Sequence, residues 1–294
     1  MRKVLSNPLA IITFLAPAFL LYAFIMLIPI GWALGYTVFD GSPIKGFHFV
    51  GFENYIKIFS DKAVWDAFWF GLKYAVVVTS GQVGFGLILS LVYVFYLKGG
   101  SAWVRTLIFF PVVLPTVAVA QIFSKLVAIA PQYGLVNAFL TGIGQEALVQ
   151  AWLGQGSTAF WVIVIMDIWR AMGFYAILLY AGVVEVPAEL IEAAKIDGAT
   201  DFQASRYIVI PLLRPVLVSA IVFSLNGTLK VFDTILALTN GGPGTATSPL
   251  TIYFQKVAFA FGQYGYGSTI AVFLTLECLL VTMLVLIFNR REND

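Results

Sequence analysis

The sequence contains few of the residues on which soluble enzymes and disulfide-stabilised proteins depend. It has a single cysteine, Cys278, so no disulfide can form within the chain, and its single histidine, His48, has no cysteine or second histidine to complete a zinc site. No G-x-x-x-x-G-K-[ST] segment is present, so the chain has no phosphate-binding loop of that type. No nucleophile–base pair or set of metal ligands appears either, which makes a membrane-embedded enzyme the least favoured class.

Charged residues are also scarce. Asp, Glu, Lys and Arg make up 11% of the 294 residues, against about 25% in soluble domains. Hydrophobic residues make up 60%, and the mean hydropathy is +0.92. The net charge of +2, without any basic tract, gives no indication of nucleic-acid binding. The composition predicts an all-α membrane protein with one transmembrane domain over residues 1–294.

Six apolar stretches are long enough to cross a bilayer, whose hydrocarbon core of about 30 Å needs about 20 helical residues. The first follows Arg2 and Lys3; it is too long for a signal-peptide core and lacks a small-residue cleavage site, so we expect a retained helix. The predicted spans cover approximately residues 9–39, 67–97, 104–127, 159–184, 216–238 and 266–288.

Glycines, prolines and polar residues predict details of these spans and their connectors. In the second span, Gly81, Gly84 and Gly86 predict close helix packing. In the third, Pro111 and Pro115 predict a bend. The connector 40–66 is polar, with a short amphipathic piece at about 52–59. The connector 128–158 is mostly uncharged, and we expect Gly134 and Asn137 to be turn residues within it.

A polar segment, residues 185–215, separates the fourth and fifth spans. Pro187 suits a first helical position, and Gly198 suits a helix stop. Thr200 with Gln203 three residues later is typical of a capping box that opens a second helix. The pattern predicts two short helices joined by a tight turn. A plain connecting loop would need neither these caps nor the two adjacent alanines before the glycine, so we expect a docking surface.

This segment resembles the EAA loop of permease subunits from binding-protein-dependent ABC importers. In that family the loop lies in the cytoplasm and inserts its short helix into a groove on the ATP-hydrolysing subunit. The resemblance therefore implies a type I ABC importer permease fold with six transmembrane helices and a cytoplasmic coupling loop at about 185–215. The ATPase-coupling residues that it implies are Glu192, Ala193, Ala194, Asp197, Gly198 and Ala199, and Ile208 and Pro211 also fit the pattern.

Other segments resemble the sugar-permease branch of the same family. They read GFENYIKIF, FFPVVLPTVAVA, VFDTILALTNGGP and YGYGS, and they extend the resemblance from about residue 10 to 290. The resemblance implies a second permease subunit in a heterodimer, two ATPase subunits at the cytoplasmic face, and an extracellular or periplasmic sugar-binding protein. ATP and Mg²⁺ would then be bound by the ATPase, with no cofactor on this multi-pass chain of a prokaryotic plasma (inner) membrane.

The distribution of positive charge gives an independent orientation. With six spans, both termini, the Lys98–Arg105 loop and the polar segment 185–215 lie on one side. By the positive-inside rule, the side that is richer in Lys and Arg is cytoplasmic. That side has nine such residues against four: Arg2, Lys3, Lys98, Arg105, Lys195, Arg206, Arg214, Arg290 and Arg291, against Lys45, Lys57, Lys62 and Lys256. Both termini are therefore expected in the cytoplasm.

Polar residues inside spans indicate where a solute passes, because a charge at the bilayer centre costs about 2.5–3.5 kcal/mol and faces a partner or a water-filled cavity. Asp167 and Arg170 stand three residues apart on the fourth span and can neutralise each other. On the fifth span, we expect Asn226, Lys230 and Asp233 to share one helix face. Aromatic faces and hydrogen-bonding groups suit a sugar, and the candidate substrate-pathway residues are Asp167, Trp169, Arg170, Phe174, Ser224, Asn226, Thr228, Lys230 and Asp233.

Each candidate also has a purely structural interpretation. The charges can form ion pairs within one helix, the Ser224 and Thr228 hydroxyls can bond to their own backbone, and Trp169 and Phe174 can pack against lipid or a neighbouring helix. Glu277 on the last span matches no motif of the family, and a helix-packing role is possible for it.

These features favour a permease subunit of an ATP-driven importer for a disaccharide or oligosaccharide, working by alternating access. One alternative keeps this architecture but carries glycerol phosphate, which would need several converging cations. The other is an ion-coupled secondary transporter with a proton relay, for which the spans show no repeated halves with interrupted helices. The relay would consist of Asp167, Arg170, Lys230, Asp233 and Glu277.

Overall fold

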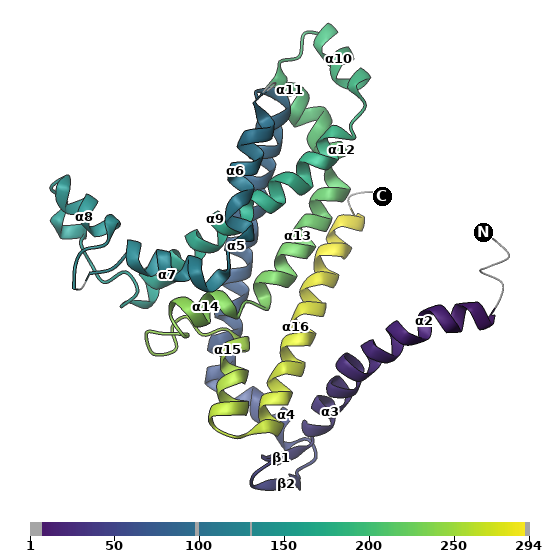
Figure 1. Ribbon diagram of the computed structural model, residues 1–294, viewed down its shortest axis with the longest axis vertical. Helices are drawn as coiled ribbons and strands as arrows, with labels where there is room; N and C mark the ends of the chain where they lie inside the picture. Colours follow the sequence, from purple (N-terminus) through teal and green to yellow (C-terminus); the bar gives the residue numbers. More distant parts are fainter. Residues whose placement is uncertain (1–7, 98–99, 130, 292–294) are drawn as a thin grey trace. The chain divides into compact units, whose positions relative to one another are not determined.

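The computed structural model describes residues 8–97, 100–129 and 131–291, and these are mostly helical (Figure 1). Arg2, Lys3 and Lys98, three of the cations that orient the spans, lie outside the described residues. Within these residues, four helices are long and apolar enough to cross a membrane. The number rises to as many as six if each of two bent pairs counts as one span, namely Ser101–Val113 with Thr116–Leu126 and Asp201–Leu212 with Arg214–Leu229. The upper number agrees with the six predicted spans.

The first and second spans lie close to their predicted ranges. The first consists of α2 (Pro8–Tyr22), a π-helical turn (Ala23–Leu27) and α3 (Ile28–Tyr36). The second is the single helix α5 (Lys62–Phe95). The fourth and sixth are α9 (Gly156–Val184) and α16 (Tyr264–Arg291), so all four long spans are confirmed as helices.

The third span is not one helix. It consists of α6 (Ser101–Val113) and α7 (Thr116–Leu126), whose axes differ by 96°. The break falls at Leu114, whose backbone is extended because the following Pro115 disfavours the helical conformation there. The predicted proline bend is therefore confirmed, and at 96° it divides the predicted span into two helices.

The fifth span is also interrupted. Helix α13 (Arg214–Leu229) ends near the middle of the predicted stretch, and α14 (Asp233–Leu238) begins after a non-helical Val231 and Phe232. The Thr251 hydroxyl donates a hydrogen bond to the Val231 carbonyl, which therefore does not need a helical partner. The predicted face shared by Asn226, Lys230 and Asp233 does not exist, because a single helix does not carry all three.

Contacts divide the chain into two compact units, each with its own packing. One contains the chain up to Val64 together with Phe254–Phe273; the other contains Trp65–Tyr253 and the chain from Leu274 onward. In the second unit, α6 packs along α9 and α7 packs against α14. Its largest buried cluster includes Tyr74, Phe160, Ile163, Met166 and Ile235.

Glycines allow close approach at two of the three predicted positions on α5. A β-carbon on Gly86 would lie 2.7 Å from the Tyr175 β-carbon and 2.9 Å from the Tyr175 carbonyl carbon of α9. A β-carbon on Gly81 would collide with the Ile168 side chain. At Gly84 it would meet nothing within 4 Å in the described chain, so the packing role predicted there is not confirmed.

The connectors contain more structure than the sequence pattern predicts. The first holds an antiparallel hairpin of β1 (Phe39–Ser42) and β2 (Gly46–Phe49), in which Phe39 pairs with Phe49. The hairpin is followed by α4 (Glu53–Ser60), which confirms the amphipathic piece predicted at 52–59. Two further short helices in connectors are α8 (Leu135–Gly142) and α15 (Leu250–Gln255).

Asn137 is not a turn residue. It lies within α8 and is fully buried, where its Nδ2 donates to the carbonyls of Ala128 and Gln150, at 3.1 Å each. Its Oδ1 accepts a 2.8 Å hydrogen bond from Trp152 Nε1. A buried amide must satisfy its donors and acceptor, so Asn137 fixes the path of the whole connector.

The polar segment folds as its local sequence predicts. Helix α10 (Ala188–Ile196) starts just after Pro187 and is followed by Gly198, which has a φ of +85°. Thr200 and Gln203 form both hydrogen bonds of a capping box before α11 (Asp201–Ala204). A π-helical turn (Ser205–Val209) and α12 (Ile210–Leu212) then lead into α13.

Candidate functional site

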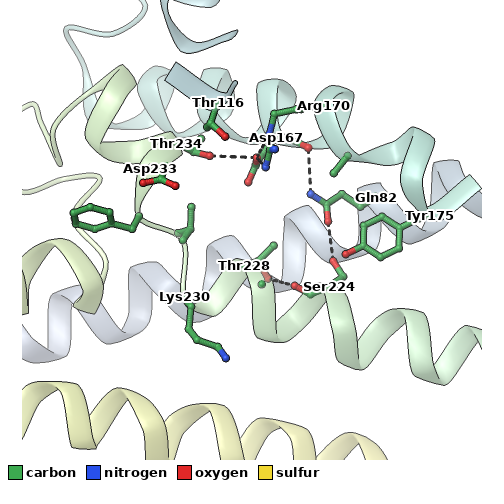
Figure 2. A pocket seen from close by; sticks show the side chains of 14 residues that line it. Gln82, Thr116, Asp167, Arg170, Tyr175, Ser224, Thr228, Lys230, Asp233 and Thr234 are labelled. Carbon is green, nitrogen blue, oxygen red and sulfur yellow. Dashed lines mark hydrogen bonds and ion pairs between the residues drawn. The ribbon is translucent and has the colours of Figure 1, made fainter. Parts of the chain in front are cut away.

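A polar pocket of about 240 Å³ lies at the break between α13 and α14 (Figure 2). Its wall is formed by side chains of α5, α7, α9 and α13 together with residues 230–234, all within the second compact unit. Six of the nine candidate pathway residues line it: Asp167, Arg170, Ser224, Thr228, Lys230 and Asp233.

Asp167 is the hydrogen-bonding centre of this pocket and is only 4% exposed. Its Oδ2 accepts a 2.5 Å hydrogen bond from the Tyr74 hydroxyl of α5. Its Oδ1 accepts hydrogen bonds from Arg170 Nη2 at 3.2 Å and from the Thr234 hydroxyl of α14 at 3.3 Å. The predicted Asp167–Arg170 pair is therefore present, and the carboxylate also holds α5, α9 and α14 together.

A second hydrogen-bond chain links α5, α9 and α13 on the other side of the pocket (Figure 2). Gln82 Nε2 donates to the Asp167 backbone carbonyl at 3.1 Å, and Gln82 Oε1 accepts from the Ser224 hydroxyl at 2.8 Å. Ser224 Oγ also lies 3.0 Å from Thr79 Oγ1, whereas the Thr228 hydroxyl donates to the Ser224 carbonyl at 2.8 Å. A buried polar network of this kind positions helices as well as offering groups to a solute.

Three further residues of these networks were not predicted from the sequence: Tyr74, Gln82 and Thr234. Each is polar and fully or nearly fully buried. Gln82 could have been predicted from the sequence, because an amide within an apolar span needs hydrogen-bond partners. Tyr74 and Thr234 were harder to predict, since tyrosine and threonine are common in membrane helices. Only the fold brings these two side chains to Asp167.

The two remaining charges of the pocket are exposed and do not pair with each other. Lys230 lies just beyond the end of α13 and Asp233 at the start of α14, and no ion pair joins them in the described part of the chain. In Figure 2 the Lys230 side chain points away from Asp167 and Arg170. The charges of the wall sum to zero: +1 for each of Arg170 and Lys230, and −1 for each of Asp167 and Asp233.

The other three candidate residues lie outside the pocket wall. The Trp169 ring packs against Phe123 of α7, with 5.7 Å between ring centroids, and Phe174 packs against Phe223 of α13, also at 5.7 Å. Asn226 Nδ2 donates to the Thr282 hydroxyl of α16 at 2.9 Å. These contacts join helices to one another, which is the structural interpretation that the sequence left open.

The polar segment 185–215 has an exposed surface around its tight turn. No residue of α10 is buried, and a salt bridge of 2.8 Å between Lys195 Nζ and Asp201 Oδ1 spans the turn at Gly198. Large apolar side chains beside the turn are exposed: Ile196, Phe202 and Tyr207. A shallow groove of about 290 Å³ runs from Asp197 to Ile208. Exposed apolar groups rimmed by polar ones are typical of an interaction surface.

Across residues 8–97, 100–129 and 131–291, no group of three or more His, Cys, Asp or Glu side chains could hold a metal ion.

Residues 82–294 match the family described as binding-protein-dependent transport system inner membrane component. The chain belongs to this family. It is 33% identical over 285 residues to a probable ABC transporter permease protein of Bacillus subtilis, covering 96% of each chain. It is 34% identical over 246 residues to the trehalose/maltose transport system permease protein MalF of Thermococcus litoralis, covering 84% of this chain and 81% of that one.

Among solved structures, this permease is similar to a chain of a bacterial ABC transporter involved in the import of the acidic polysaccharide alginate. The TM-score is 0.84 at 22% identity, covering 97% of this chain and 96% of that chain. This likeness confirms the predicted permease fold. The chain is accordingly a transport component of the inner membrane, which agrees with the sequence prediction that it is not an enzyme.

Proposed function

We propose that this permease forms half of the translocation pathway of an ATP-driven importer for an uncharged disaccharide or oligosaccharide. The observation that carries this proposal is the polar pocket, whose four charges cancel and whose other polar groups are hydroxyls and an amide. Such groups exchange hydrogen bonds with the hydroxyls of a sugar. Relatives named for trehalose/maltose and for diacetylchitobiose support a sugar as the cargo.

The position of the pocket supports a role in translocation. In transporters, discontinuous helices near the membrane midplane commonly form the substrate site, because unwound backbone can contact the cargo there. The break between α13 and α14 has this character. Because the third and fifth spans are both interrupted, the absence of interrupted helices expected from the sequence is wrong and no longer argues against an ion-coupled transporter. Ligand pockets usually enclose about 300–1,000 Å³. The pocket of this chain encloses only about 240 Å³, which is less than a usual ligand pocket. In this proposal a second permease subunit supplies the rest of the site.

An anionic cargo such as glycerol phosphate is less well supported. Arg170 is already bonded to Asp167, and Lys230 points away from the pocket centre (Figure 2). The alginate importer shares this fold and acts on an acidic polysaccharide, so the fold alone does not decide the charge of the cargo. The charges of the pocket wall favour a neutral one.

Coupling to ATP would occur at the exposed turn between α10 and α11. In this proposal, α10 docks into a groove of a separate ATPase subunit, with contacts from Glu192, Ala193, Ala194, Asp197, Gly198 and Ala199. That subunit binds ATP and Mg²⁺. This side of the membrane, together with both termini, would then be cytoplasmic. On the other side, a sugar-binding protein would deliver the cargo; the alginate importer has been crystallised with its pentasaccharide-bound periplasmic protein.

We propose that alternating access works through the two pocket-forming helices that flank the polar segment in sequence, α9 and α13. Movement of the docked α10 would be transmitted through α9 on one side and α13 on the other, which both contribute to the pocket wall. A proton relay is less well supported, because Asp167 is held by three hydrogen-bond donors within the chain.

The proposal is tested with the complete transporter reconstituted in vesicles. We expect uptake of a neutral oligosaccharide that requires ATP and persists with an uncoupler. Uptake that collapses with the uncoupler but ignores ATP depletion would show an ion-coupled transporter instead.

Gly198 offers a matched test of coupling. Gly198→Val places a β-branched residue at φ +85°, which it rarely adopts, whereas Gly198→Asn is far better tolerated in this conformation. We expect Gly198→Val to abolish uptake while membrane insertion stays intact, and Gly198→Asn to retain more activity. Normal uptake by the valine variant would show that the turn does not transmit force from the ATPase.

A further inference from the structure

Helix α4 has three distinct faces, although it is only eight residues long. One face is buried and includes Asn54 and Ile58. A second carries the charged residues Glu53 and Lys57. The third points outward and is apolar: Phe52, just before the helix, Ile56 and Phe59 are 72%, 68% and 75% exposed. A helix that faced only protein and water would have a polar outer face.

Contacts within the first compact unit fix this orientation of α4. Asn54 Nδ2 donates to the carbonyls of Thr37 and Phe39, at 2.9 Å each. Lys57 Nζ donates to Gln263 Oε1 at 3.2 Å and lies 4.0 Å from the centroid of the Tyr266 ring. Rotating α4 to bury its apolar face would break these contacts, so the exposure of that face is built into the fold.

The hairpin before α4 continues the apolar surface. Ile44 at its tip is 96% exposed, and Phe49 on β2 is also exposed while its ring packs edge-on against Phe39. Two cations, Lys45 and Lys62, lie exposed beside these apolar residues in sequence. An apolar surface with neighbouring lysines is typical of a segment that lies in the headgroup region of a bilayer.

The place of this segment in the chain limits what can cover it. Residues 37–61 connect two membrane spans, α3 and α5. Both ends of this connecting segment are therefore held where a span leaves the membrane. The preceding span is exposed up to this point, with Trp32 and Leu34 on its surface. Tryptophan is enriched where a span leaves the hydrocarbon. The apolar surface of α4 thus continues the exposed apolar surface of the first span.

We propose that α4 and the hairpin tip form an interfacial anchor, in which Phe52, Ile56 and Phe59 insert into the lipid at the level where the spans leave the hydrocarbon. The ligand is therefore the phospholipid bilayer itself, and Lys45 and Lys62 reach toward lipid phosphates. The anchor fixes the depth of the first span and the hairpin in the membrane. It depends only on the membrane location of the chain and stands whether or not the cargo is a sugar.

The experiment measures the surroundings of single nitroxide labels in the complete transporter reconstituted in phospholipid nanodiscs. The background is Cys278→Ala, which removes the native thiol. Labels are attached at Ile56→Cys on the apolar face and, as a matched control, at Glu53→Cys on the charged face. Oxygen concentrates in lipid, whereas a water-soluble nickel chelate stays outside it, so the ratio of the two relaxation effects reports insertion.

We expect the oxygen-to-nickel ratio at position 56 to exceed that at position 53 several-fold. Phe59→Cys should give the same result and serves if the first variant assembles poorly. Strong relaxation by nickel at position 56 would show an open, water-facing surface and overturn the proposal. Protection from both reagents would overturn it as well, because it would show that another protein subunit covers α4.

Discussion

Tyr74 on α5 donates a 2.5 Å hydrogen bond to the carboxylate of Asp167 on α9, 93 residues further along the chain. Both side chains are almost completely buried, at 0% and 4% exposure. The same carboxylate bonds to Arg170 and Thr234, so one acidic group joins three helices around the polar pocket. This arrangement gives Asp167 a structural role that its exposed neighbour Asp233 does not have.

Asp167→Asn should destabilise the protein because it removes the negative charge that satisfies Arg170 and replaces an acceptor of the Tyr74 hydroxyl by an amide. We expect a loss of about 1–3 kcal/mol in the free energy of unfolding. Asp233→Asn is the control, since Asp233 is exposed and an exposed substitution changes stability by about 0.5 kcal/mol or less. Unfolding of the purified chain in detergent checks both; equal effects would show that the Asp167 network contributes no stability.

Ser224→Ala should leave Gln82 Oε1 without its hydroxyl donor inside the helix bundle. We expect a loss of about 1 kcal/mol, together with weaker sugar-dependent stimulation of the ATPase in the assembled transporter. Ser219→Ala on the same helix is the control, because its hydroxyl is exposed and bonds to the Pro215 carbonyl of its own helix. The interpretation fails if the two alanine variants have the same stability and the same response to sugar.

Gly86→Ala should separate α5 from α9. Its β-carbon would lie 2.7–3.0 Å from atoms of Tyr175 and Ala176, and overpacking of this kind costs about 1–3 kcal/mol. Gly84→Ala, two residues away on the same helix, should stabilise the chain by up to about 1 kcal/mol, since alanine is the better helix former and nothing lies within 4 Å. Thermal unfolding of both variants should therefore shift in opposite directions, and a shift in the same direction would contradict the α5–α9 packing.

Glu277→Leu should raise the stability of the chain. Glu277 is 6% exposed, and its Oε1 is buried without a hydrogen-bond partner in the described part of the chain. Removing an unsatisfied buried polar group relieves a cost of about 1–3 kcal/mol. Glu277→Gln is the control, because its amide remains buried and polar. A leucine variant that is no more stable than the natural chain would contradict this prediction. A leucine variant that is more stable but fails to transport would show that Glu277 also has a functional role.

Local chemistry made several features predictable from the sequence. The capping box of Thr200 and Gln203, the left-handed Gly198 and the bend at Pro115 depend on residues a few positions apart, so their pattern is visible in one dimension. The Asp167–Arg170 pair belongs to this group, because residues three apart on a helix share a face. The four uninterrupted spans followed from hydrophobic length alone.

What the sequence by itself determined is that the chain crosses a membrane, where its longest helices lie and that the polar segment 185–215 folds into short capped helices. Only the tertiary structure decided the shape of the pocket, because its decisive bonds join residues far apart: Tyr74 to Asp167, Gln82 to Ser224, and Thr251 to the carbonyl of Val231. The Thr251 hydrogen bond lies at the break between α13 and α14. No glycine or proline occurs between residues 228 and 238, so the sequence gives no helix-breaking residue there. A hydrogen bond from a residue twenty positions away can satisfy a backbone carbonyl as well as a helical hydrogen bond does. The local sequence around the carbonyl does not show which of the two partners it has.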